Sequence, residues 1–301
     1  MEVVLEKTNS ARIARALVKA RVAAGSPAMD MVLTLLVVTD DDNVGEALRT
    51  ATTLSREHPS RVIGVILGDG RGGAKLDAKV RVGENSSGES ILLRIGGELT
   101  QHAESVVLPL LLPDSPVVVW WPGKPPTNPS EDPIGRLARR RLTDAEATSS
   151  PVRSLKAVAK SYSPGDTDLS WTRLTPWRAL LAAALDQSTG KVTGGTVVAG
   201  AGNPAATLLV AWLESRLKIS IVTKRSETDQ IASVVLDTAD GEVRIERVSP
   251  TSSHFSVPGS SPREVPLGAR TLAELLAEDL RRLDADDVYE QTIRHMLKES
   301  S

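Results

Sequence analysis

Residues 31–67 read MVLTLLVVTDDDNVGEALRTATTLSREHPSRVIGVIL, and this stretch decides the fold class. The runs 31–38 and 61–67 are almost entirely apolar, which is typical of strands that are covered on both faces. Between them, 43–56 carries apolar residues at helical spacing, and Asn43 at its start fits a capping box. A strand, a helix and a second buried strand in succession predict an α/β protein.

The second half of the chain follows a similar order. Segments 31–110 and 192–283 each predict a strand, a helix, a strand, two further strands and a helix. This order suggests a related pair of α/β domains with mixed sheets, although residue identity between the halves is too low to claim a repeat. Small and polar residues gather near 146–170. We therefore expect an N-terminal domain over 1–160 and a C-terminal domain with terminal helices over 161–301.

Several connections predict particular local structures. A helix is expected over 99–110, and a short helix is expected after Asp132. Thr175 is expected to cap the helix that follows it. Residues 249–268 are rich in Ser, Pro and Gly, which predicts a loop with at most one short strand. GDGRGG (68–73) precedes a strand-like segment, so we interpret it as a hairpin connection and not as a dinucleotide loop.

Composition excludes several classes of function. The formal net charge of −2 supplies no basic excess for neutralising phosphates, so nucleic acid is not an expected partner. The chain contains no cysteine, which excludes disulfides, thiolate catalysis and zinc–thiolate sites. The longest apolar stretch, 106–121, is interrupted by prolines and an aspartate and is too short for a membrane helix. No signal peptide is recognisable, and we expect a cytoplasmic protein without a membrane partner.

Catalytic motifs are scarce. The sequence has no H-x-x-x-H pair, no carboxylate at metal spacing, no G-x-S-x-G turn and no P-loop. His58 precedes a proline at a predicted helix end, where an imidazolium favours the helix dipole. We therefore predict that the chain is not an enzyme and holds neither a metal nor a cofactor.

One glycine pattern leaves an alternative open. Gly200, Gly202 and Ala205 form a G-x-G-x-x-A motif between a predicted strand and helix, and Asn203 can cap that helix. The next strand ends at Lys224-Arg225, where a cation could meet a phosphate. Further strand-like segments follow in place of the second helix of a Rossmann half, so a structural turn is favoured. The alternative function is an NADP-binding or sugar-phosphate-binding protein that uses this loop.

A basic cluster is the other candidate for an anion. Arg136, Arg139, Arg140 and Arg141 follow closely on one another, which is typical of a solvated face and also fits an acidic partner or a phosphorylated sugar. The candidate anion-binding residues are Gly200, Gly202, Asn203, Arg136 and Arg140.

Tryptophan and arginine gather in one block, YSPGDTDLSWTRLTPWRALL (162–181). Trp and Arg are the side chains that most often anchor interfaces, and Trp171 lies in a polar segment, so it is the best interface candidate. Asp166 and Asp168 are candidates for partner contact, although turn formation or capping explains them equally well. Trp120 and Trp121 are neighbours on a predicted strand and must point to opposite faces.

Five blocks of this sequence resemble the actinobacterial glucose-6-phosphate dehydrogenase assembly protein family, OpcA. The W-W-P and G-D-T-D-L-x-W-x-R motifs are the specific part of the resemblance, which covers nearly the whole chain. The blocks are EHPSRVI (57–63), SVVLPLLLPDSPVVVWWPG (105–123), DPIGRLARRRLTDA (132–145), YSPGDTDLSWTRLTPWRALLAAALDQ (162–187) and LAEDLRRLDADDVYE (276–290).

The resemblance implies a non-catalytic partner of glucose-6-phosphate dehydrogenase, the first enzyme of the oxidative pentose phosphate pathway. Such a partner promotes assembly of the dehydrogenase oligomer or activates it allosterically. Thiol redox control, which the resemblance links to cyanobacterial relatives, cannot act through a chain without cysteine. The state of the chain's own oligomer stays open. The matched blocks give these candidate partner contacts: Trp120, Trp121, Asp166, Asp168, Trp171, Arg173 and Arg178.

Overall fold

The computed structural model describes residues 1–25, 31–83 and 89–299, and they form two compact units built around separate sheets. The first unit comprises Met1–Asp144, Ser161–Thr167 and Leu272–Ala285. The second comprises Ala145–Lys160, Asp168–Thr271 and Asp286–Ser301. Both sheets are mixed and both units carry helices, so the predicted α/β class is confirmed. Each unit is assembled from more than one stretch of sequence.

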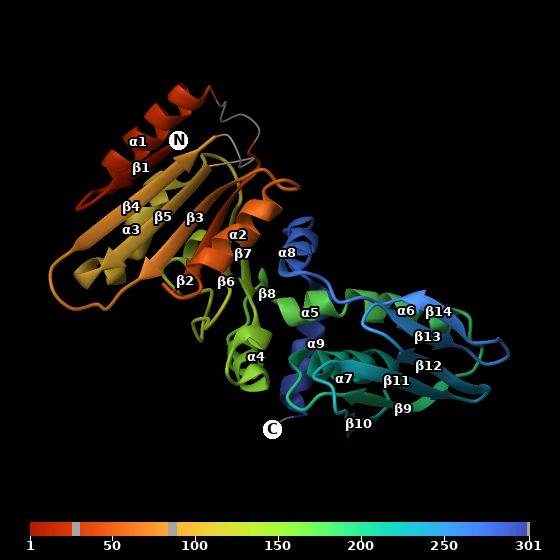
Figure 1. Ribbon diagram of the computed structural model, residues 1–301. Helices are drawn as coiled ribbons and strands as arrows, with labels where there is room; N and C mark the ends of the chain where they lie inside the picture. Colours follow the sequence, from red (N-terminus) through yellow and green to blue (C-terminus); the bar gives the residue numbers. More distant parts are fainter. Residues whose placement is uncertain (26–30, 84–88, 300–301) are drawn as a thin grey trace. The chain divides into compact units, whose positions relative to one another are not determined.

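The sheet of the first unit has the strand order β1-β4-β5-β3-β2-β6-β7-β8 (Figure 1). Its middle is parallel from β5 through β3, β2 and β6 to β7, and β4 and β1 add antiparallel strands at one edge. The strands are β1 (Glu2–Leu5), β2 (Leu33–Thr39), β3 (Ser60–Leu67), β4 (Lys75–Val82), β5 (Glu89–Gly96), β6 (Val117–Trp121), β7 (Arg140–Thr143) and β8 (Asp166–Asp168).

The two apolar runs that open the sequence argument become β2 and β3, which pair in parallel at the centre of this sheet. Their burial on both faces follows from helices on each side: α2 packs on β2 and β3, and α1 contributes Ile13 and Leu17 to the core beneath β4 and β5. The helical elements of this unit are α1 (Ser10–Ala24), α2 (Val44–Leu54), η2 (Gly97–His102), α3 (Ala103–Val107), η3 (Leu108–Leu110), η4 (Gly135–Leu137) and α8 (Leu272–Leu280).

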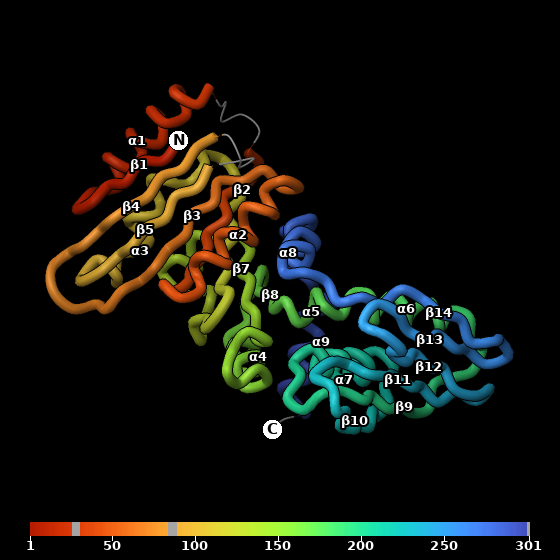
Figure 2. The backbone as a smooth tube through the Cα atoms, in the orientation of Figure 1, coloured from red at the N-terminus to blue at the C-terminus, as the bar shows by residue number. Residues whose placement is uncertain are grey.

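The sheet of the second unit has the order β10-β9-β11-β12-β13-β14. Only β9 and β10 are parallel, joined by α7, and the remaining strands form an antiparallel meander that Figure 2 traces as one continuous path. The strands are β9 (Val192–Ala199), β10 (Ile221–Arg225), β11 (Ile231–Thr238), β12 (Gly241–Arg247), β13 (Ser252–Ser256) and β14 (Arg263–Pro266). The helical elements are η5 (Ala145–Ala147), α4 (Pro151–Lys160), α5 (Leu169–Arg173), α6 (Thr175–Asp186), α7 (Pro204–Leu217) and α9 (Asp287–Lys298).

The two sheets are not copies of one another, so the expectation of a related pair is wrong in topology. In the first unit, β4 and β5 follow the βαβ segment in sequence, and β5 is the one that pairs with β3, the second strand of that segment. In the second unit, β11 follows the βαβ segment and pairs with β9, its first strand. The order of elements along the sequence is similar, but the added strand lies beside the second strand of the βαβ segment in the first unit and beside the first strand of that segment in the second unit.

Four local expectations are corrected. The helix expected over 99–110 is broken into η2, α3 and η3. Residues 249–268 contain two strands, β13 and β14. Asn43 has helical backbone angles and makes no capping hydrogen bond; its backbone N–H and its side-chain amide both donate to Asp40. Thr175 is already inside α6, where its hydroxyl accepts from Arg178.

The segment after GDGRGG is a strand, as expected, but β5 lies between β3 and β4, so the connection is not a hairpin. No helix within 1–25, 31–83 or 89–299 combines the length and the apolarity required to cross a bilayer.

Candidate functional site

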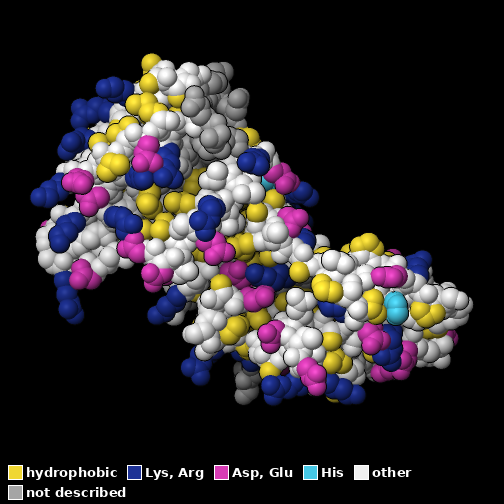
Figure 3. All heavy atoms as spheres, in the orientation of Figure 1, with side chains coloured by type: hydrophobic (Ala, Val, Ile, Leu, Met, Phe, Trp, Pro, Cys, Tyr) yellow, Lys and Arg dark blue, Asp and Glu magenta, His cyan; other side chains and the backbone are white. Residues whose placement is uncertain are grey.

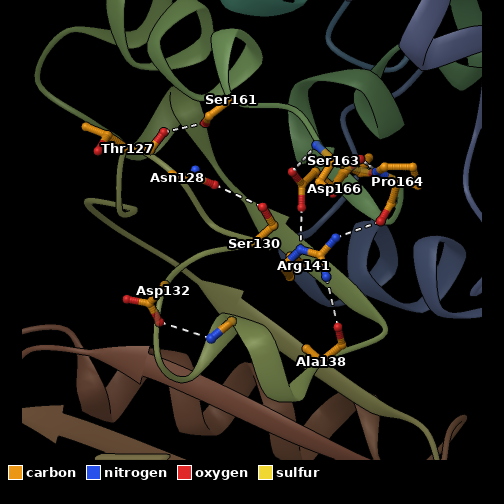
Figure 4. Close-up of polar contacts among 12 residues, drawn as sticks. Thr127, Asn128, Ser130, Asp132, Ala138, Arg141, Ser161, Ser163, Pro164 and Asp166 are labelled. Atoms are coloured by element: carbon orange, nitrogen blue, oxygen red, sulfur yellow. Dashed lines mark hydrogen bonds and ion pairs between the residues drawn. The ribbon is translucent and has the colours of Figure 1, made fainter. Parts of the chain in front are cut away.

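Asp166 forms a buried ion pair with Arg141 inside the first unit (Figure 4). The second carboxylate oxygen of Asp166 accepts from the Ser163 N–H at 2.8 Å. Burial raises the pKa of the Asp166 carboxyl, while the Arg141 guanidinium and the Ser163 N–H pull that pKa down. Both charges are almost completely removed from water, at 4% and 7% exposure. This pair therefore fixes the local backbone and offers little surface to a partner.

Arg141 also binds the loop that carries Asp166. Its guanidinium donates to the carbonyl of Ala138 at 2.9 Å and to the carbonyl of Pro164 at 2.7 Å. The backbone explains Gly165: its φ is +97°, and a Cβ there would lie 2.4 Å from the carbonyl oxygen of Arg139. The motif Y-S-P-G-D is therefore explained by a tight loop held against β7.

Asp168 is a helix cap. Its side chain accepts from the Ser170 N–H at the start of α5 and from the Ala145 N–H, both at 2.9 Å, and it is 2% exposed. The capping role that the sequence left open for this residue is thus what the structure shows.

Trp171 lies at the centre of an aromatic and charged cluster in the second unit. Its indole N–H donates to the carboxylate of Asp286 at 2.8 Å, the guanidinium carbon of Arg178 lies 3.7 Å from its ring centroid, and Tyr289 packs at 5.7 Å. Asp286 also caps α9 through the N–H groups of Val288 and Tyr289. With 2% exposure, Trp171 joins α5, α6 and α9 and is not itself a surface contact.

Trp120 and Trp121 are both buried on β6, at 0% and 3% exposure. Trp121 belongs to the core cluster of the first unit, and its neighbour points to the opposite face, as strand alternation requires. Arg173 keeps 25% of its side chain exposed and pairs with Glu146 at 2.8 Å. Arg178 is half-buried above Trp171.

The basic cluster is largely neutralised within the first unit. Arg140 is 5% exposed. Its guanidinium donates to the carboxylate of Asp279 at 2.6 Å and to the backbone carbonyl of Asp284 at 2.9 Å. Arg139 pairs with the Asp284 carboxylate at 2.5 Å. Of the two residues proposed for an anion there, Arg136 is exposed and Arg140 is not. The structure therefore does not bring Arg136 and Arg140 together as free cations.

The partners of these arginines are the residues that sequence reasoning missed. Asp279 and Asp284 lie in one block, LAEDLRRLDADDVYE (276–290), together with Asp286, the acceptor for Trp171, and the sequence marks this block only by its family resemblance. A signal was present: an arginine run and an aspartate run of opposite charge. Sequence spacing gave no reason to pair segments so far apart along the chain.

The Gly200 loop has the strand-turn-helix form that its motif predicts. Asn203 caps α7 by accepting from the Ala206 N–H at 2.7 Å. A Cβ on Gly200 would lie 2.5 Å from the Cα of Asp229, so the glycine is required by the chain that packs on it. Gly202 has a φ of +71° with open space around it. Gly200, Gly202 and Asn203 line a pocket of about 540 Å³ together with Lys224 and Arg225.

No group of three or more His, Asp or Glu side chains suited to a metal occurs among the residues that the structure describes.

Comparison with known proteins adds two domain matches. Residues 51–160 match the family model described as the N-terminal domain of a glucose-6-phosphate dehydrogenase subunit, and residues 164–293 match that of its C-terminal domain. A Synechocystis sp. protein named OxPP cycle protein OpcA is 28% identical over 144 residues, covering 43% of this chain and 29% of that protein. A Nostoc punctiforme protein of the same name is 26% identical over 197 residues, covering 60% and 42%.

The chain therefore spans less than half the length of these curated relatives. Among solved structures, an oxidoreductase from Sinorhizobium meliloti aligns with a TM-score of 0.41 and 11% identity, over 89% of this chain and 87% of that one.

Proposed function

Since the chain belongs to the OpcA family of glucose-6-phosphate dehydrogenase subunits, we propose that it acts by binding this dehydrogenase and favouring one state of its oligomer. The observation that carries the proposal is the pair of domain matches, which follow one another in order from residue 51 to residue 293. The names of the Synechocystis and Nostoc relatives, which refer to the OxPP cycle, support the same pathway.

The proposed action requires no reaction in this chain. A protein that binds one oligomeric state more tightly shifts the population toward that state by its differential affinity. A tenfold gain in dehydrogenase activity needs about 1.4 kcal/mol of coupling. We further propose that the complex forms in the cytoplasm, a reducing compartment with which a chain without cysteine is compatible.

The residues expected to contact the partner take two proposed roles. Arg173 and Arg178 keep exposed area, so we assign them direct contact. The five buried residues take an indirect role, in which each fixes the element of its own unit that carries it: β6 or the 161–167 loop in the first unit, and the start of α5 in the second. These five are Trp120, Trp121, Asp166, Asp168 and Trp171.

The test is light scattering after size exclusion, with the purified chain, the dehydrogenase of the same organism, and their mixture. We expect the mixture to give a new species whose mass fixes the stoichiometry, and the dehydrogenase in that species to turn over faster. Two unchanged peaks together with unchanged activity, in the presence of glucose 6-phosphate and NADP, would remove the proposal.

A further inference from the structure

Strand β10 forms an open edge of the second sheet. It pairs with β9 on one side, and on the other side no strand among the described residues pairs with it. Ile221 is buried, but the next four residues, 222–225, are all exposed, and Val222 exposes 56% of its surface. An edge strand of this kind presents backbone donors and acceptors that another chain can pair with.

The pairing with β9 shows which groups face outward. The Ser226 N–H donates to the carbonyl of Ala199 at 2.8 Å. Every second residue before Ser226, which means 224 and 222, therefore also directs its N–H and C=O groups toward β9. Thr223 and Arg225 therefore point their N–H and C=O groups away from the sheet. Ile221 obeys the same alternation, because its N–H faces outward and is taken by the Glu214 side chain.

A groove runs beside this edge. The pocket of about 540 Å³ is bordered by α7 through Ala206 and Val210, by Val152 of α4, and by the end of β10. Its walls combine these apolar side chains with the hydroxyl of Thr207. An edge strand facing a helix across a groove suits an extended peptide, which adds a strand and places alternate side chains against the helix.

The groove and the edge are cationic. Lys224 and Arg225 line the pocket, and neither makes an ion pair with any residue in the described part of the chain. Lys218, just before β10, is also exposed. Figure 3 shows Lys and Arg side chains gathered along the rim where Figure 1 places β10. Two acidic residues, Glu227 and Asp229, border an adjoining hollow beyond the end of the strand.

We propose that the β10 edge binds an extended, carboxylate-bearing segment of the dehydrogenase as an added strand. This inference rests on the proposed function for the identity of the partner, and on the edge, the groove and the charges for the mode of binding. A second copy of the chain is a poorer occupant, because its own β10 carries the same cations. The segment pairs with the backbone of Thr223 and Arg225 and places carboxylates beside Lys224 and Arg225.

A proline substitution tests the strand pairing. Thr223→Pro removes an outward N–H that β9 does not use, and proline is compatible with an edge strand. We expect the dissociation constant for the dehydrogenase to rise at least about tenfold, with the melting temperature of the chain unchanged. The double variant K224E/R225E should weaken binding by a similar factor and should reduce its dependence on salt.

The opposite edge provides a matched control. The Leu267 N–H donates to the carbonyl of Thr251, so every second residue before Leu267 directs its backbone groups toward β13. Glu264 lies between two such residues, and its N–H therefore points away from β13. Glu264→Pro thus removes an outward N–H in the same way from the opposite edge of the same sheet. We expect this variant to bind the dehydrogenase within about twofold of the unchanged chain.

Hydrogen exchange separates this inference from the proposed function. In the complex, the amides of Thr223 and Arg225 should exchange more slowly than in the free chain. If a complex forms and these amides are unaffected, with Thr223→Pro binding normally, the docking mode is overturned and the proposed function stands. If no complex forms, both are overturned.

A nucleotide is the other occupant that the test can identify. NADP alone, added at millimolar concentration, should leave the exchange of Thr223 and Arg225 unchanged. Slowed exchange of these amides with NADP, together with competition between NADP and the dehydrogenase, would assign the groove to a phosphate ligand and overturn the proposal.

Discussion

The Arg141–Asp166 ion pair holds both of its charges almost completely out of water. Removing one partner leaves the other charge buried without compensation, at a cost of about 3–5 kcal/mol. We expect R141M and D166L each to lose stability in that range. The double variant should lose less than the sum, by about 1–3 kcal/mol, because no lone charge remains. Urea denaturation of the four proteins measures this coupling.

An exposed pair serves as the control for that cycle. Arg281 and Glu57 form an ion pair at 2.6 Å, with 66% and 50% of their side chains in water. Water screens these charges, so R281M should leave the urea midpoint unchanged. A coupling of zero for Arg141 and Asp166 would show that their charges are not held apart from water as the structure indicates.

The sequence indicated which residues are unusual, but not where each of them lies or what it contacts. The sequence identified Asp166, Asp168 and Trp171 as unusual, and each does make several specific contacts. Their buried positions could not be predicted, because Trp171 lies in a polar segment and its acceptor, Asp286, lies more than a hundred residues away. A long-range hydrogen bond leaves no periodicity in the sequence.

At the scale of single elements, α7 offers a direct test of capping. Asn203→Ala removes the acceptor for the Ala206 N–H and should destabilise the second unit by about 0.5–2 kcal/mol. Asn43→Ala, at the start of α2, removes a side chain that caps nothing and should cost clearly less. Thermal unfolding of the two variants, followed by circular dichroism, makes the comparison. Equal losses would contradict the difference between the two helix starts.

The loop before α7 contains two glycines that are needed for different reasons, one for close packing and the other for its backbone conformation. Gly200→Ala places a Cβ against the backbone of 228–229 and should cost about 1–3 kcal/mol through overpacking. Gly202→Ala meets no neighbour, and its positive φ alone should cost about 1–2 kcal/mol. Chemical denaturation measures both. A Gly200→Ala variant as stable as the unchanged chain would show that the 228–229 backbone is not packed on this glycine.

Elements with a strong local pattern were predicted well. The buried runs are β2 and β3, and the predicted cap of α7 at Asn203 is confirmed. Elements that depend on their neighbours were missed. Strands β13 and β14 are short and polar, and they form because β12 offers an edge to β13, which in turn offers one to β14. Periodicity within 249–268 carries no sign of that edge.

At the scale of the whole molecule, the interleaved units predict how fragments behave. A fragment 1–160 lacks 161–167 and 272–285, which belong to the first unit and supply Asp166 and Asp279 to its buried arginines. We expect this fragment to unfold at a lower temperature than the same unit in the full chain. A synthetic peptide of 272–285, added in excess, should raise that temperature by binding the folded form. Circular dichroism melts measure both effects.

A scrambled peptide of the same composition controls for nonspecific effects in that experiment. If fragment 1–160 has the melting temperature of the full chain and the peptide does not change it, then α8 does not stabilise the first unit. Sequence inspection could predict two sheets but not this sharing of segments, since composition changes near residue 146 only once while the chain crosses between units repeatedly.

The stretch 272–299 contributes α8 to one unit and α9 to the other, and this has a consequence for synthesis on the ribosome. Arg140 is translated well over a hundred residues before Asp279, and Trp171 over a hundred before Asp286. During that interval Arg140 and Trp171 lack these partners, so both units remain incomplete while the chain elongates. A nascent chain stopped before residue 272 therefore leaves two unfinished cores, and both are open to chaperones and proteases.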